Sequence, residues 1–160
     1  MGDSWTQHHV DEHKKGLIVV SEPGADGILV KASLGQVAIN VADLARATAF
    51  YRDRLGLTFL FDAGKMVFFD CGGVRLMLSK PEKPEFDHPS SILYLTISGI
   101  GETFERLKNV GVQFVSEPHL VAPMPDHDLW MAFFNDSEGN TLALMSREPK
   151  ADATPSGGRS

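Results

Sequence analysis

The sequence contains a single cysteine, Cys71, among 160 residues, so no disulfide can form within the chain. A lone cysteine is typical of a protein from a reducing compartment. No apolar run approaches the ~20 residues that a helix needs to cross a bilayer. The start of the chain is polar and carries acidic residues, unlike a secretory signal. The sequence therefore predicts a soluble cytoplasmic protein that does not enter a membrane.

Positive charge is also scarce. The chain has 15 lysines and arginines against 21 aspartates and glutamates, which gives a formal net charge of -6, and it has no basic cluster. Proteins that bind nucleic acid or anionic membranes normally present such a cluster. We therefore expect neither nucleic acid nor a membrane surface as a partner.

Two short runs of alternating residues, at 36–43 and 92–99, each end where a helix is predicted to begin. In each run one face of the predicted strand is aliphatic and the other is mixed. The aliphatic residues are Val37, Ile39 and Val41 in the first run and Leu93, Leu95 and Ile97 in the second. We expect the aliphatic faces to pack beneath helices and the mixed faces to carry the chemistry.

The two runs open the halves of an internal repeat. Predicted strands lie near 34–41, 57–62, 65–70 and 74–79 in the first half, and near 92–97, 112–117, 129–134 and 140–146 in the second. A helix follows the first strand of each half, at about 43–55 in the first half, with Asp43 and Ser98 as predicted N-caps. Asp70 and Asp136, and likewise Leu76 and Leu142, lie 66 positions apart. The pattern predicts an α+β fold of two tandem βαβββ modules.

The domain is predicted to span residues 33–147, with module one at about 33–80 and module two at about 90–147. A charged, Pro-rich linker joins the modules at 80–89. Residues 1–32 form an N-terminal extension that contains His8, His9 and His13, either as a metal-binding cluster or as part of a solvated terminus. Residues 148–160 are predicted to be a disordered tail.

Three stretches carry a family resemblance: QVAINVADLARATAFYRDRLGL, GGVRLMLS and FFNDSEGNTLALM. Across residues 34–147 they resemble the glyoxalase/bleomycin-resistance/dioxygenase superfamily, also called the vicinal oxygen chelate fold. The resemblance implies two modules that curl a mixed sheet around a cleft, often within a homodimer. That superfamily includes isomerases, lyases, epimerases, ring-cleaving dioxygenases, thiol transferases and drug-sequestering proteins, so the fold does not decide the activity.

The resemblance also implies four positions that hold a divalent metal in family enzymes, usually as His, Gln or Glu. They correspond here to Gln36, Met77, Ile92 and Ala143. Only Gln36 is of ligand type, and a neutral amide oxygen is a weak donor for zinc, nickel or iron. We therefore expect no metal at the usual site and no cofactor, with Gln36 hydrogen-bonding a ligand or its neighbours.

The mixed faces offer hydrogen-bonding groups on an apolar floor, which is typical of a small-molecule pocket. The candidate ligand-binding residues are Gln36, Asn40, Arg75, Met77, Tyr94, Thr96, Trp130 and Thr141. Arg75 could clamp a carboxylate or phosphate, or could face water at the edge of the cleft. Trp130 could stack on a planar ligand or fill the core.

The candidate catalytic residues are His119 and His127, which lie in the stretch between residues 119 and 134. Imidazole titrates near neutral pH, so either histidine could act as a general acid or base. With Asp126 or Asp128 they could also form a displaced divalent metal site. The alternative is a polar, Pro-rich loop whose side chains hydrogen-bond its own backbone. Glu138, in the turn before the last strand, is expected to face solvent.

Three functions remain open from the sequence. The first is a small-molecule binder without the usual metal site, which the missing ligand set favours; the acidic net charge would suit a cationic ligand. The second is a lyase or isomerase of the glyoxalase or epimerase type that acts next to a carbonyl, with or without a displaced metal. The third is an accessory subunit with a vestigial cleft.

Overall fold

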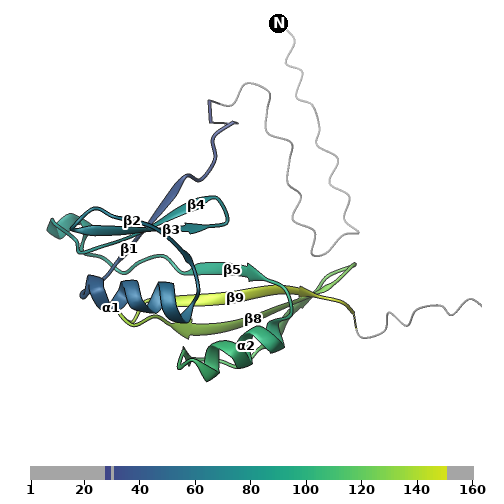
Figure 1. Ribbon diagram of the computed structural model, residues 1–160. Coiled ribbons are helices and arrows are strands. Elements are labelled where there is room, and N and C mark those ends of the chain that lie inside the picture. Colours follow the sequence, from purple (N-terminus) through teal and green to yellow (C-terminus); the bar gives the residue numbers. More distant parts are fainter. Residues whose placement is uncertain (1–27, 30, 151–160) are drawn as a thin grey trace, which may run out of the picture. The chain divides into compact units, whose positions relative to one another are not determined.

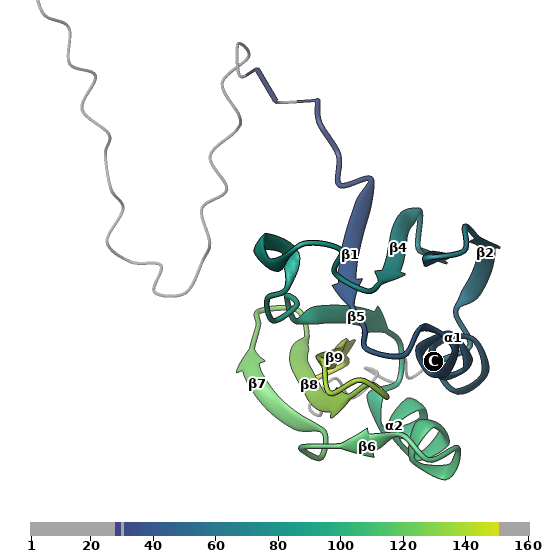
Figure 2. The same cartoon turned by 90° about the vertical axis from the view of Figure 1, so that its left-hand side faces the viewer.

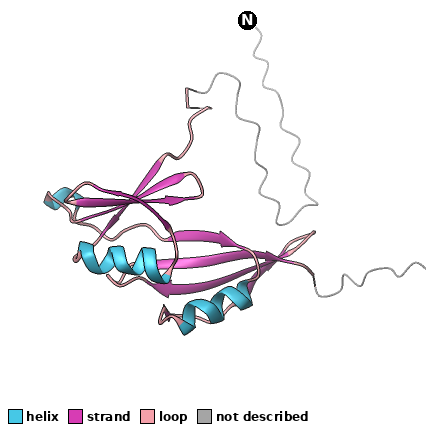
Figure 3. Cartoon of the chain, viewed as in Figure 1, coloured by secondary structure: helices cyan, strands magenta, loops and turns pink. Residues whose placement is uncertain are grey.

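The computed structural model describes residues 28, 29 and 31–150. The chain divides into two units, residues 1–33 and 34–160, and the helices and strands described below belong to the second (Figures 1 and 3). The predicted cluster of His8, His9 and His13 and the tail from residue 151 lie outside the described residues. Within the described part of the chain, no helix has the length and apolar character needed to cross a bilayer.

Module one forms a four-stranded mixed sheet with the strand order β1-β4-β3-β2. Its elements are β1 (Gln36–Asn40), α1 (Leu44–Ala49), the π-helical turn η1 (Phe50–Arg54), β2 (Thr58–Asp62), β3 (Met66–Cys71) and β4 (Val74–Ser79). Strand β1 runs parallel to β4, and the other neighbours are antiparallel. A short 3-10 turn, η2 (Pro84–Phe86), lies in the linker.

Module two forms a second mixed sheet with the order β5-β9-β8-β6, and β7 also pairs with β8 (Figure 2). Its elements are β5 (Leu93–Ile97), α2 (Ile100–Asn109), β6 (Gln113–Phe114), β7 (His119–Pro123), β8 (Asp128–Asn135) and β9 (Thr141–Glu148). The predicted α+β fold of two repeated modules is confirmed, with one mixed sheet in each module.

The aliphatic faces of the strands form the core, as predicted. Ile39, Leu78 and Leu144 are at most 2% exposed. The helices bury Ala47, Tyr51, Ile100 and Phe104 against them, in one hydrophobic cluster that both modules share. The opposite face of each sheet carries no helix of its own module (Figure 1). We call these two surfaces the open faces.

The first helix departs from the prediction of one continuous helix to residue 55. Regular α-helix ends at Ala49, and the next turn is widened, with the Leu55 amide donating to the Phe50 carbonyl at 3.0 Å. The two adjacent aromatic residues of this turn, Phe50 and Tyr51, are both buried, at 4% and 0% exposure. A widened turn brings two consecutive side chains onto the face that packs on the sheet.

The predicted N-caps have different outcomes. Asp43 caps α1, because its Oδ1 accepts from the Arg46 amide at 3.0 Å. Ser98 does not cap α2: the helix starts after Gly99, whose φ of 68° is left-handed, and the Ile100 amide donates to Glu148 Oε1 at 2.9 Å. Glu148 lies in the predicted tail, but β9 continues through it and brings its carboxylate to the N-terminus of α2.

The prediction of a Pro-rich loop before β8 missed a strand. Residues 119–123 form β7 in an antiparallel hairpin with β8, closed by a turn in which the Met124 amide donates to the His127 carbonyl at 2.8 Å. Proline is tolerated at the end of such a strand, where it removes no internal ladder bond.

Candidate functional site

The open face of module one carries the residues that alternation had placed there. In the strand register Gln36 lies opposite Arg75, Ala38 opposite Met77 and Asn40 opposite Ser79. Residues paired across a sheet point to the same side, so these six side chains share one surface. The same surface extends onto β3, where Phe68 pairs with Met77 and Met66 pairs with Ser79.

Over one end of this face the linker encloses a pocket of about 390 Å³. Its floor is mainly apolar and comes from the strands, through Ala38, Met66 and Met77. Its outer wall comes from the linker and the β2–β3 turn, through Lys65, Lys80, Pro81, Glu82, Lys83, Phe86 and His88. We call this space the linker pocket.

Asn40 holds the linker in this position. Its side-chain nitrogen donates to the Phe86 carbonyl at 2.6 Å and to the His88 carbonyl at 2.9 Å, and its backbone amide donates to Ser90 Oγ at 2.9 Å. Both protons of the Asn40 amide group are therefore used within the chain. Asn40 shapes the linker pocket instead of offering these donors to a ligand.

Arg75 lies on the same face, away from the linker. Its guanidinium carbon is 5.9 Å from the ring centroid of Phe61 and 5.7 Å from that of Phe68, and the two rings stack at 4.5 Å. Such cation–π contact orients an exposed arginine without neutralising it. The residue is exposed to water near the start of β4, and both of its predicted roles are compatible with this position.

The open face of module two is aromatic at its centre. Tyr94 pairs with Ala143, which pairs with Phe133, and the Tyr94 and Phe133 ring centroids are 6.1 Å apart. The imidazole of His119 lies 6.3 Å from the Phe133 ring on its other side. Thr96 and Thr141 lie on the same face. Phe133 was missed because every residue from 129 to 134 is apolar, so alternation carries no signal there.

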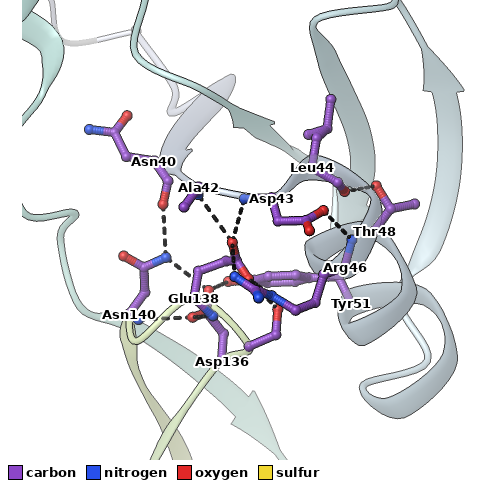
Figure 4. A network of polar contacts seen from close by, with 11 residues as sticks. Asn40, Ala42, Asp43, Leu44, Arg46, Thr48, Tyr51, Asp136, Glu138 and Asn140 are labelled. Atoms are coloured by element: carbon purple, nitrogen blue, oxygen red, sulfur yellow. Dashed lines mark hydrogen bonds and ion pairs between the residues drawn. The ribbon is translucent and has the colours of Figure 1, made fainter.

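The two modules are joined by a network of polar contacts around the β8–β9 turn (Figure 4). Glu138 Oε1 accepts from the backbone amides of Ala42 at 3.1 Å and Asp43 at 2.7 Å, and Arg46 binds the same carboxylate through two nitrogens at 2.7 and 3.1 Å. The Glu138 side chain is 1% exposed, so the expectation that it faces solvent was wrong. It acts as a second cap of α1 from the other module.

The ionisation of Glu138 follows from these contacts. Burial opposes the charged form, but the hydrogen bonds from Arg46, the Asp43 amide and Ser137 outweigh it and lower the pKa of Glu138 to about 2. The neighbouring Asp136 is 7% exposed, and its Oδ2 accepts a hydrogen bond from the Tyr51 hydroxyl at 2.8 Å. Burial, and then the charge of Asp136, raise the pKa of Tyr51.

Module one lacks the counterpart of this network. The repeat places Gly72 where module two has Glu138, and the turn at Asp70–Gly73 lies beside β5. A hollow of about 630 Å³ remains there, lined by residues that include Cys71, Thr96 and Thr103. Burial, and then Asp70, raise the pKa of the Cys71 thiol, so it is not an activated nucleophile.

Comparison with known families decides the identity of the fold. The protein-family model that describes the Glyoxalase/Bleomycin resistance protein/Dioxygenase superfamily matches residues 33–144, more than half of the chain. The chain belongs to this superfamily. A comparison with curated protein sequences finds no match.

Solved structures agree with the superfamily assignment. UcmS2 is 28% identical with a TM-score of 0.57, covering 71% of this chain and 97% of that one. A superfamily member from Sphaerobacter thermophilus is 25% identical with a TM-score of 0.57, covering 72% and 97%. Lactoylglutathione lyase from Agrobacterium tumefaciens is similar in fold, at 22% identity and a TM-score of 0.55, covering 72% and 93%.

The residues at the superfamily's usual metal positions do not fit a metal. The Gln36 amide donates to the Met77 sulfur at 3.7 Å, Ala143 is fully buried, and Ile92 precedes β5 and is exposed. One amide beside a thioether is a poor donor set for a hard or borderline cation. Nor do residues 28, 29 and 31–150 contain another group of three or more His, Cys, Asp or Glu that could hold one.

The structure does not bring the two predicted catalytic histidines together. His119 pairs with Met131, whereas His127 lies in the hairpin turn, four residues before Met131. At strand spacing this corresponds to a separation of about 13 Å. The Nδ1 atoms bind locally, to the Glu117 carbonyl at 2.9 Å and to the Asp126 carboxylate at 2.8 Å. The hydrogen bond with His127 lowers the pKa of Asp126. Neither imidazole lines the linker pocket.

Trp130 is not on an open face. It lies one position from Met131 and three from Phe133, so its side chain points to the opposite face of β8. There it pairs with Ser146 and packs against the hydrophobic core. This placement agrees with the core-filling alternative and gives no support to stacking on a ligand at an open face. Gln36, Arg75, Met77, Tyr94, Thr96 and Thr141 lie on the open faces as predicted.

Proposed function

We propose that the protein binds a small organic molecule on the open face of module one, beneath the linker, without the superfamily's usual metal site. The observation that carries this proposal is the linker pocket, whose volume of about 390 Å³ falls in the usual range for ligand sites. Its floor contains two methionines, Met66 and Met77, whose flexible side chains adapt to irregular apolar ligands.

The lyase or isomerase alternative has less support. A proton transfer next to a carbonyl needs a base and an electrophile within reach of one substrate atom. The two candidate histidines are separated by the length of a hairpin, and Arg75 is stacked on Phe61 and Phe68. No observation on the described residues favours this alternative over binding.

The proposal is tested with phenylnaphthylamine, a neutral dye that fluoresces in apolar surroundings. We expect the wild-type protein to bind it at one site, and the substitution Ala38→Phe to weaken binding by about tenfold or more, because a ring on the pocket floor fills the space. Asn109→Phe, which adds the same ring on the exposed end of α2, is the control. Equal binding by both variants would refute the site, and so would a wild-type protein that binds neither this dye nor its sulfonated analogue.

The proposed assembly is a homodimer. Strand β2 is the last strand of its sheet, and its residues Phe59, Leu60 and Phe61 are 38%, 44% and 44% exposed. An apolar edge strand of this kind is normally covered in a native protein. We expect sedimentation velocity to show a dimer that Leu60→Glu dissociates; a wild-type monomer at every concentration tested would contradict this.

A further inference from the structure

The linker pocket is bordered by positive charge, in contrast to the chain as a whole. Three lysines, Lys65, Lys80 and Lys83, line it, with Glu82 as the one acidic residue among its lining. The formal net charge of the chain is -6. Because salt screens charges beyond ~10 Å, a bound molecule responds to these nearby groups and not to the total.

The lysines are placed by independent parts of the chain. Lys65 lies in the β2–β3 turn, just before β3, whereas Lys80 and Lys83 belong to the linker that Asn40 holds at Phe86 and His88. Their charges therefore meet over the Ala38, Met66 and Met77 floor only because the linker is folded back across β1. This arrangement separates an apolar floor from a cationic rim.

The carboxylates that contact these lysines are exchangeable. Lys65 Nζ is 3.0 Å from Glu82, and Lys83 Nζ is 3.9 Å from Glu85. All four side chains are more than half exposed, and ion pairs of this kind contribute little to stability. An anionic ligand with its apolar part on the floor could take the place of Glu82 beside Lys65.

We infer that the ligand of the linker pocket is amphipathic and anionic, with a carboxylate, phosphate or sulfonate group at the lysine rim and an apolar body on the methionine floor. This rests on the proposed function, since it specifies what the same pocket takes. It replaces the cationic ligand expected from net charge.

The test compares two dyes with the same aromatic skeleton. Anilinonaphthalene sulfonate carries one sulfonate, and phenylnaphthylamine carries none. We expect the sulfonate dye to bind wild-type protein more tightly than the neutral dye, and its affinity alone to fall as salt is raised to about 0.5 M. Ala38→Phe should weaken both dyes, which confines the comparison to the linker pocket.

Charge variants identify the groups responsible. Lys65→Gln or Lys80→Gln should weaken the sulfonate dye about two- to fivefold each, and the triple variant with Lys83→Gln on the order of tenfold or more, with the neutral dye unchanged. Glu82→Gln should tighten the sulfonate dye about twofold, because it frees Lys65. Arg106→Gln, on exposed α2, removes the same charge elsewhere and should change neither dye.

The outcomes separate the two proposals. One outcome is that both dyes bind in the Ala38-sensitive site while the lysine and Glu82 variants leave the ratio of the two dye affinities unchanged. In that case the ligand class is wrong and the binding function stands. If neither dye binds in that site, both proposals fall. Tighter binding of the sulfonate dye that the lysine variants abolish and Glu82→Gln increases supports both.

Discussion

Replacing Asp136 with alanine is expected to lower the free energy of unfolding by about 3–5 kcal/mol. The carboxylate is 7% exposed and accepts four hydrogen bonds. Its Oδ2 accepts from the Tyr51 hydroxyl at 2.8 Å and from Asn140 Nδ2 at 2.9 Å, and its Oδ1 accepts from the amides of Glu138 and Asn140, both at 2.8 Å. Alanine would leave these donors without partners.

The repeat supplies a matched control for this substitution. Asp70 occupies the equivalent turn of module one, and its side chain accepts one hydrogen bond, from the Gly73 amide at 3.2 Å, at an exposed site. Asp70→Ala should therefore cost about 1 kcal/mol or less. Urea unfolding followed by circular dichroism measures both, and an equal loss for the two variants would contradict the role assigned to Asp136.

A double variant tests the mechanism. Tyr51→Phe alone should cost about 1 kcal/mol, because it removes one hydrogen bond without opening a cavity. Combined with Asp136→Ala it should cost less than the sum of the two, since phenylalanine leaves no unpaired hydroxyl in a fully buried position. Additive losses would mean that the Tyr51–Asp136 contact is energetically irrelevant.

The substitution Glu138→Gln should destabilise the protein by about 2 kcal/mol at neutral pH and by much less in acid. Glutamine cannot carry the charge that Arg46 and the α1 N-terminus bind. The carboxyl pKa falls from 4.5 to about 2 on folding. Its contribution is therefore fully present above pH ~4.5 and is lost as the pH falls toward 2. The expected loss is smaller than the full pKa change implies, because the Arg46 side chain is 56% exposed and solvent screens its charge.

The free energy of unfolding of the wild type and of Glu138→Gln is measured at about pH 7 and at about pH 3. The change with pH in the difference between the two proteins reports the ionisation of this carboxyl group. Arg46→Gln is the companion variant and should cost about 1 kcal/mol, because the amides of Ala42 and Asp43 still bind Glu138. A gap between wild type and Glu138→Gln that does not change with pH would contradict the assigned linkage.

The repeat and the open faces were predictable because they depend on local periodicity. Side chains two apart in a strand share a face, so the alternation in β1, β4 and β5 assigned Gln36, Met77 and Tyr94 correctly. The same rule is silent for β8, where both faces are apolar. Only pairing with β9 decided that Phe133 joins the open face while Trp130 packs into the core.

Local sequence patterns were enough to predict the superfamily, the order of the elements, the Asp43 cap and the absence of the usual metal ligands from their positions. Tertiary structure alone decided that Glu138 caps a helix 95 positions away, that Asn40 holds the linker, and that three lysines surround one apolar floor. The physical reason is range. Strand periodicity is set by neighbouring residues, whereas the partners of a carboxylate or a lysine depend on how distant segments pack.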